Sequence, residues 1–266
     1  MYTLATLHQL RRRLGLASSD TADDDRLRVA LEAATAHIER IAGRTFVPRV
    51  ATLEHTVLDA NELVLDDDLL DLTSLTNGDG SSINLSDVIR FPNGNESSGI
   101  LRLTGNSVFV WQTTPLHAIQ VTGVWGWHDR WSQAWRGSGD TVQDNPLSMT
   151  ATTLTVTDAD GLDADGATPR FQVGHLLRIE SEYVRVIAVD TVNNQLTIER
   201  GVNGTTAASH VQNSAIDIFQ PARDVQMLTL RWAAWLYRAP DIDDTGGIPA
   251  DFIAAAASLR RVRVQS

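Results

Sequence analysis

The chain has 266 residues, a formal net charge of −11, no lysine and no cysteine. The length allows one or two domains with a hydrophobic core, and the absence of cysteine excludes disulfides, thiol catalysis and cysteine-ligated zinc. An acidic surface disfavours non-specific nucleic-acid binding, and no apolar run or charge pattern marks a membrane helix or a signal peptide.

Two helices are predicted at the N-terminus, over residues 3–16 and 21–46, joined by a polar linker at 17–22. Each has apolar residues at spacings of three and four, which define one buried face. Gly15 and Gly43 follow the last apolar positions and are typical of left-handed C-caps. The chain therefore opens with an αα-hairpin. The apolar positions are Leu4, Leu7, Leu10, Leu14, Leu27, Ala30, Leu31, Ala34, Ile38 and Ile41.

From Pro48 to His128 the apolar period changes to two, which predicts strands. Asn77-Gly78-Asp79-Gly80 has the composition of a hairpin turn. We expect these strands to form a small antiparallel sheet packed on the helices. The predicted strands are 51–58, 62–65, 72–76, 83–85, 99–103, 107–111 and 118–125.

Residues 125–147 place four of the seven tryptophans in a polar, glycine-rich context. Exposed tryptophan usually marks an interface, so this segment is a candidate binding loop. The alternatives are a satellite core folded under the loop and, less favoured, a sugar-stacking platform. The candidate interface residues here are Trp127, Trp131 and Trp135, beside Trp125.

Residues 148–218 read as five short strands with close turns, which favours a small β-barrel or sandwich. Helical patterns return from Pro221 and from Pro249. The predicted fold class is therefore α+β. It has a helical core domain formed by residues 1–147 and 219–266, containing the αα-hairpin, the C-terminal helices and a small antiparallel sheet. The β module at 148–218 is inserted into that domain.

Two arginine clusters lie at predicted helix ends, where cations favour the helix dipole. Arginine also binds carboxylates in a bidentate manner, so the alternative is contact with an acidic partner. The alternation after Arg260 also permits an added strand on a partner's sheet. These candidate interface residues are Arg11, Arg12, Arg13, Arg260, Arg261 and Arg263.

No segment carries a recognisable catalytic or metal-binding pattern. The acidic stretch at 158–166 fails the calcium-loop spacing, because Leu162 and Asp163 occupy its fifth and sixth positions. The seven histidines form neither HxH nor HExxH, and nucleophile-elbow, P-loop and dinucleotide motifs do not occur. We therefore expect no catalytic residue, metal or cofactor, and no enzymatic activity.

The order of elements, with D-D-x-L-x-x-x-L-E-A-A-x-x-x-I-E-R-x-x-G-R-x-F at 24–46, resembles phage head-to-tail adaptor proteins, also called connector or head completion proteins. The segment Q-V-T-G-V-W-G-W at 120–127 looks like the strand before that family's return helix, and 221–237 looks like the return helix. Segments 171–174, 179–184 and 199–210 resemble small β modules of phage structural proteins.

This resemblance implies a structural virion protein without enzymatic activity, made in the host cytoplasm and located at the head–tail neck. Such proteins form a homo-oligomeric ring, usually a dodecamer, that joins the portal protein to the tail or nozzle. DNA passes through the channel without specific binding, and no membrane is involved. The arginine clusters would then contact the portal. The alternatives are a tryptophan-rich carbohydrate- or protein-binding module of a phage tail or neck, and a cell-wall or DNA-processing enzyme.

Overall fold

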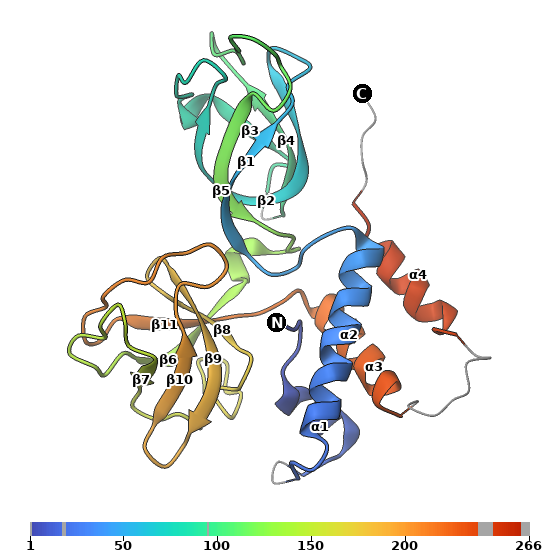
Figure 1. Cartoon of the computed structure of the whole chain (residues 1–266), viewed down its shortest axis with the longest axis vertical. Coiled ribbons are helices and arrows are strands. Elements are labelled where there is room, and N and C mark those ends of the chain that lie inside the picture. The colour runs from blue at the N-terminus through green and yellow to red at the C-terminus, as the bar shows by residue number, and fades with distance from the viewer. Residues whose placement is uncertain (1, 18–19, 95, 239–246, 262–266) are drawn as a thin grey trace. The chain divides into compact units, whose positions relative to one another are not determined.

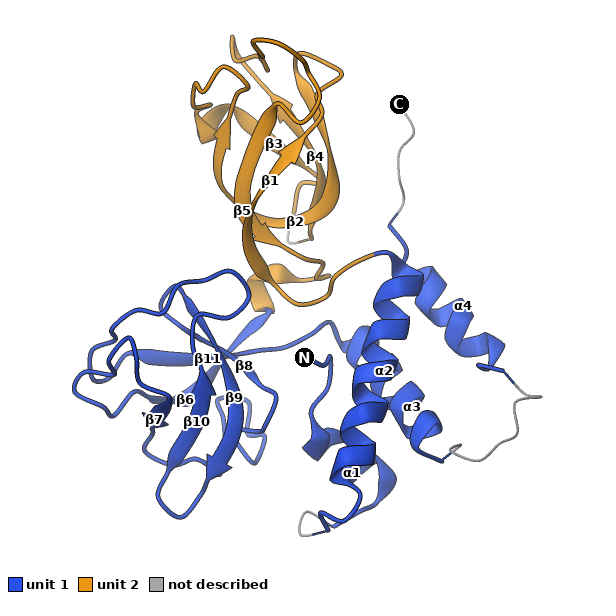
Figure 2. Ribbon diagram, in the orientation of Figure 1, with its two compact units in different colours: residues 1–43, 134–266 blue, residues 44–133 orange. Residues whose placement is uncertain are grey.

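The computed structural model describes residues 2–17, 20–94, 96–238 and 247–261. The chain forms two compact units, residues 1–43 with 134–266 and residues 44–133 (Figure 2). We describe each unit by itself. The predicted division into 1–147 with 219–266 and an inserted 148–218 stays a prediction.

The predicted fold class, an α+β protein built around a helical core, is wrong. The described residues contain two antiparallel sheets, of five and six strands, and four α-helices (Figure 1). The 44–133 sheet is built around a core of its own rather than being a small sheet that needs a helical layer. Local periodicity predicted the strands, but it does not say which surface each strand packs against.

The helices of the first unit are α1 (Leu7–Leu14), α2 (Asp24–Ala42), α3 (Arg223–Arg238) and α4 (Ala250–Ser258). The long helix α2 packs against each of the other three (Figure 1). Gly15 and Gly43 adopt the predicted left-handed conformation, with φ of 74° and 61°. The first helix begins later than predicted, because Thr6 caps it through a capping box with Gln9.

The second sheet also belongs to the first unit and has the order β6-β11-β8-β9-β10-β7. The strands are β6 (Trp135–Thr141), β7 (Thr153–Thr155), β8 (Leu176–Ile179), β9 (Glu182–Asp190), β10 (Gln195–Glu199) and β11 (Ala215–Phe219). Five of them match the strands predicted for the β module. The sixth, β6, was expected to be part of the tryptophan loop. Their inward side chains form one core with Leu154, Phe171, Val184 and Ile216 among its members.

The 44–133 unit holds a sheet with the order β1-β5-β2-β4-β3. Its strands are β1 (Arg49–His55), β2 (Glu62–Thr76), β3 (Val88–Phe91), β4 (Ser98–Leu103) and β5 (Ile119–Trp125). The long strand β2 joins two predicted strands and pairs with both β4 and β5, with register shifts that allow it to bend. The strands predicted at 83–85 and 107–111 are not formed; Leu85 instead starts a short 3₁₀ turn at Leu85–Asp87.

None of the helices in the described ranges combines the length and the apolar character needed to cross a bilayer.

Candidate functional site

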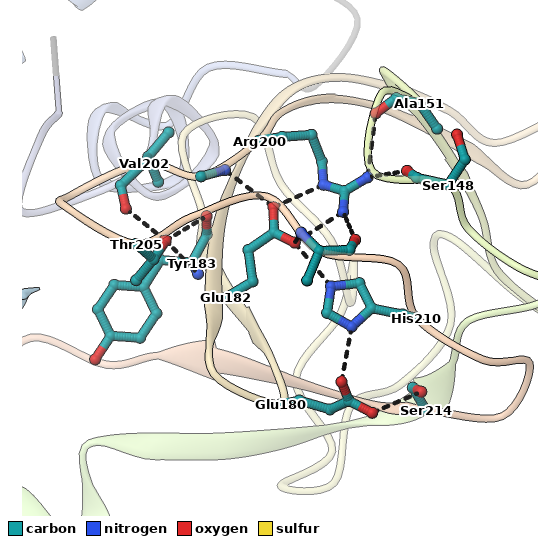
Figure 3. Close-up of polar contacts among 12 residues, drawn as sticks. Ser148, Ala151, Glu180, Glu182, Tyr183, Arg200, Val202, Thr205, His210 and Ser214 are labelled. Atoms are coloured by element: carbon teal, nitrogen blue, oxygen red, sulfur yellow. Dashed lines mark hydrogen bonds and ion pairs between the residues drawn. The ribbon is translucent and has the colours of Figure 1, made fainter.

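A buried carboxylate, that of Glu182 at the start of β9, lies beneath the loop 201–210 (Figure 3). Arg200 donates to it from Nε and Nη2, both at 2.7 Å, in a bidentate ion pair. The backbone N–H groups of Gly201 and Ala208 donate to it at 2.9 and 3.0 Å. The Nε2 atom of His210 lies 2.8 Å from Oε2. Both carboxylate oxygens are thus fully engaged by protein groups.

The guanidinium of Arg200 also holds backbone carbonyls from two separate segments. It donates to the carbonyls of Ser148 at 2.7 Å and Ala151 at 3.3 Å, and to that of Ala208 at 2.5 Å. One buried ion pair therefore fixes residues 148–151 and the loop 201–210 to the start of β9. Asn203, one of the residue types that adopt the left-handed conformation, has a φ of 53° in this loop.

The same contacts set the ionisation of Glu182. Burial by itself raises the pKa of a carboxyl group, but the bonds from Arg200, Ala208, His210 and Gly201 outweigh burial and lower the pKa of Glu182 to about 2. Glu182 is therefore ionised at neutral pH, and its charge is balanced by a guanidinium that is itself buried.

His210 is not placed to activate a nucleophile. Its Nδ1 lies 3.1 Å from Glu180 and its Nε2 lies 2.8 Å from Glu182, so carboxylates occupy both ring nitrogens. The nearby hydroxyl of Ser214 contacts Glu180 at 3.4 Å instead of the imidazole. A serine triad requires an imidazole nitrogen that accepts the hydroxyl proton. This cluster is therefore an anchor for the loop and has no catalytic geometry.

A second polar network holds the acidic turn 158–166. Asp140 of β6 accepts from the N–H groups of Thr157 and Asp158 at 3.0 and 2.9 Å, and from Arg170 at 2.6 Å. Burial raises the pKa of Asp140, but these backbone donors outweigh it and the pKa lies below its ordinary value.

The carboxylate of Asp163 makes hydrogen bonds within the turn. It accepts from the N–H groups of Asp165 and Ala167 at 3.0 and 2.8 Å, and its other oxygen pairs with Arg136 at 2.7 Å. The carboxylate of Asp163 thus stabilises the turn itself. Within the described residues no group of three or more His, Cys, Asp or Glu side chains could hold a metal ion.

The predicted arginine interface residues have different environments. Arg11 is mostly buried and pairs with Asp24 of α2, so it belongs to the helix packing. Arg12 and Arg13 are exposed, and Arg13 contacts the sulfur of Met227 at 3.7 Å. Arg260 is exposed and donates to the carbonyl of Ile41 at 2.8 Å. Arg261 is half-buried, and Arg263 lies outside the described residues.

The tryptophans do not form one exposed cluster. Trp125 is fully buried and donates from Nε1 to the carbonyl of Ala51 at 2.9 Å. Trp127 and Trp131 are half-buried in the 44–133 unit. Trp135 is half-buried in β6, with its ring 5.1 Å from that of Tyr183. Trp125 is the last residue of β5 and belongs to the main core of the 44–133 unit, which differs from both an exposed cluster and a satellite core under the loop.

Two segments that carry the adaptor resemblance meet in the 44–133 unit. Phe46 packs edge-on against Trp127, with ring centroids 5.6 Å apart, and the guanidinium of Arg44 lies 5.3 Å from the same ring. The N–H of Trp127 donates to the carbonyl of Thr45 at 2.8 Å. Arg44 also pairs with the buried Asp68 at 3.2 Å. The R-x-F and G-W ends of two distant motifs thus form one packed cluster.

No family model, curated protein or solved structure matches this chain. The interpretation of its function therefore rests on the sequence patterns and on the geometry above.

A shallow groove lies between α2 and α3, with a volume of about 430 Å³. Val29, Ala30, Ala33 and Leu236 form its apolar part, and Arg26 stacks over Tyr237 at its rim. Asp25 is the remaining polar residue of the lining.

The sequence analysis missed the Glu182–Arg200–His210 network, although its residues lie in the segments that suggested the phage β module. The available signal was alternation: Glu182 shares the inward face of β9 with Val184 and Val186. A charged residue at an inward position is expected to have a buried partner.

Proposed function

We propose that this chain is a structural protein of a tailed phage particle, a head-to-tail adaptor. It assembles into a homo-oligomeric ring that joins the portal protein to the tail or nozzle and continues the DNA channel. The dodecameric count and the location at the virion neck are part of the proposal. They come from the sequence resemblance.

The observation that carries the proposal is the cluster of Arg44, Phe46 and Trp127. Two of the motifs that carry the resemblance, at 24–46 and 120–127, lie about 80 residues apart, and a chance likeness would not require their residues to touch. In this chain Arg44 and Phe46 both contact the ring of Trp127. Because the two motifs pack together, we take them to have a common evolutionary origin.

The polar networks support assembly more than catalysis. Glu182, Asp140 and Asp163 are buried, and each accepts hydrogen bonds from several donors. Networks of this kind fix loops in one conformation, and a protein that must fit several identical neighbours benefits from fixed loops.

The charge supports passage of DNA in preference to binding. A net charge of −11 repels the phosphate backbone, so DNA in a channel lined by this protein would stay mobile. The acidic balance therefore agrees with a conduit for DNA.

A complementation experiment tests the proposal. If the protein joins heads to tails, a phage that lacks its gene should accumulate separate DNA-filled heads and tails, and adding the purified protein to that extract should restore joined, infectious particles. Joined particles in the absence of the protein would overturn the proposal. So would a failure of the purified, folded protein to join the two parts.

A further inference from the structure

A basic patch with an apolar centre lies on the helical face of the first unit. Arg13 of α1 contacts Met227 of α3, whose side chain is 53% exposed. Arg223 is one helical turn before Met227 on the same helix, and Arg12 is next to Arg13. In the described part of the chain, Arg12, Arg13 and Arg223 have no carboxylate at ion-pair distance. The patch is therefore positively charged without compensation in a protein of net charge −11.

An acidic loop with an exposed apolar side chain lies in the β-sheet part of the same unit. Leu162 is 59% exposed at the centre of the turn 158–166. Asp160 and Asp165 are exposed on either side of it in sequence, and the carboxylate of Asp165 also lies 3.8 Å from Nη1 of Arg136, in a pair that leaves the Asp165 side chain 66% exposed. The loop thus presents an apolar side chain between two carboxylates, and the basic patch presents an apolar side chain among guanidinium groups.

Hydrogen bonds from Arg170 hold the backbone of the acidic loop in this conformation. Arg170 donates to the carbonyl of Leu162 from Nε at 2.9 Å and from Nη2 at 2.6 Å, and to the carbonyl of Asp158 at 3.0 Å. The backbone of Leu162 is therefore fixed while its side chain faces solvent. A preorganised loop loses little conformational entropy when it binds.

We infer that the basic patch of one copy binds the acidic loop 158–166 of a second copy, with Met227 against Leu162 and the arginines against Asp160 and Asp165. The two surfaces differ, so the contact is heterologous and leaves each copy with one free patch and one free loop. Repetition of such a contact closes a ring when the rotation allows it. The inference rests on the proposed function and assigns the surfaces through which the ring forms.

Complementary charge favours a second copy over nucleic acid. The phosphate backbone would satisfy the arginines, but it offers nothing to the exposed side chain of Met227, and the rest of this acidic protein would repel it. The loop 158–166 supplies both the carboxylates and the apolar contact. Complementary charges around an apolar centre fix the register of an interface.

Disulfide trapping tests the contact directly, because the chain has no cysteine of its own. The Met227→Cys and Leu162→Cys variants are mixed and oxidised mildly. A disulfide forms only where two Cα atoms approach within about 7 Å, so we expect the mixture to give a cross-linked dimer. The control replaces Leu162→Cys by Val192→Cys, which is 87% exposed in the turn between β9 and β10. Equal yields with both partners would overturn the inference.

Charge reversal gives a second readout. Arg12→Glu with Arg13→Glu should lower the cross-linking yield by on the order of tenfold, since like charges placed opposite each other oppose binding. Adding Asp160→Arg and Asp165→Arg to the Leu162→Cys partner should restore the yield. The control pair Arg130→Glu with Arg238→Glu makes the same change in net charge elsewhere and should leave the yield unchanged. A failure of the swap to restore the yield would contradict the contact.

Two outcomes separate this inference from the proposed function. If the purified protein joins heads to tails but the charge-reversed variants do so equally well, the interface is wrong and the adaptor function stands. If a short DNA duplex binds wild-type protein and the Arg12→Glu, Arg13→Glu variant loses that binding without any specific cross-link, the patch is a nucleic-acid site and the inference fails.

Discussion

At the residue scale, the structure depends on charges that are buried and paired. Removing one partner of such a pair leaves the other charge buried without compensation, which costs far more than losing a surface ion pair. The Glu182–Arg200 pair is the clearest case, since both side chains are less than a tenth exposed.

Arg200→Met tests this cost. We expect it to lower the free energy of unfolding by about 3 to 5 kcal/mol, because Glu182 loses its bidentate partner and two segments lose their anchor. Urea denaturation at pH 7 measures the change. The matched control is Arg102→Met, which breaks the exposed pair with Glu62 and should cost less than about 1 kcal/mol. Similar losses in both variants would contradict a structural role for the network.

The pKa of Glu182 predicts a loss of stability in acid. The pKa of Glu182 is about 2 in the folded state and 4.5 ordinarily. The ionised Glu182 therefore contributes fully to the free energy of unfolding above pH 4.5, and this contribution disappears as the pH falls towards 2. The full effect corresponds to about 3 kcal/mol. In the Glu182→Gln variant this loss of unfolding free energy below pH 4.5 should be absent, as measured by urea denaturation from pH 6 to pH 2.5. Parallel profiles for variant and wild type would disprove the assignment.

The lowered pKa of His175 predicts a second loss of stability, which begins at a higher pH than the loss due to Glu182. Burial first, and then the positive charge of Arg136 and the nearby His8, lower the pKa of His175 from 6.5 to about 3. The folded state therefore resists protonation, and stability present above pH 6.5 declines as the pH falls through the range to 3. His175→Gln should flatten the dependence of the unfolding free energy on pH between pH 6.5 and pH 5, as measured by urea denaturation. An unchanged slope in His175→Gln would argue against this.

At the scale of elements, close backbone approach decides which glycines are required. A Cβ atom on Gly123 of β5 would lie 2.2 Å from the carbonyl oxygen of Asp71 and 2.8 Å from Leu69, where β5 pairs with β2. The neighbouring strand cannot move aside without breaking the ladder. Gly94 has nothing within 4 Å and serves as a comparison.

We therefore expect Gly123→Ala to destabilise the 44–133 unit by about 2 kcal/mol or more, as overpacking of a strand interior does. Gly94→Ala should change stability by less than about 0.5 kcal/mol. Thermal unfolding followed by tryptophan fluorescence measures both, because Trp125 lies in the core beside β5. A neutral Gly123→Ala would mean that β2 and β5 are not paired as described.

The elements themselves were predictable where one pattern dominates. The helix α2 and its end at Gly43 follow from the period of 3.6 and from a glycine after the last apolar turn. The strand β6 was missed because its inward positions hold polar residues, Ser138 and Asp140. The Ser138 hydroxyl bonds to the backbone of Asp140, and the Asp140 carboxylate takes its partners from the distant residues Thr157, Asp158 and Arg170. Alternation of polar and apolar residues cannot reveal a strand that buries polar groups.

The fold class was wrong for a related reason. The strands of 44–133 were predicted well enough, but nothing local indicates that Leu63, Leu101 and Val121 form a core with one another rather than with helices. The Glu182 network could have been suspected from a glutamate at an inward strand position. Its partners Arg200 and His210 could not, because only the folded loop brings them together.

At the scale of the whole molecule, we propose that this chain is a part of a larger assembly. Its buried networks fix loops, and its exposed basic patch and acidic loop have complementary features. A tryptophan-rich binding module is the competing interpretation. The half-buried positions of Trp127 and Trp135, each packed against other aromatic rings, do not favour it.

The most direct test of the central claim is a reconstruction focused on the neck of the phage particle that contains this protein. The account predicts a closed ring of this chain between portal and tail around the DNA channel, with both sheets recognisable in every subunit. A neck without this chain, or a single copy located elsewhere with a small molecule in an enclosed pocket, would contradict it.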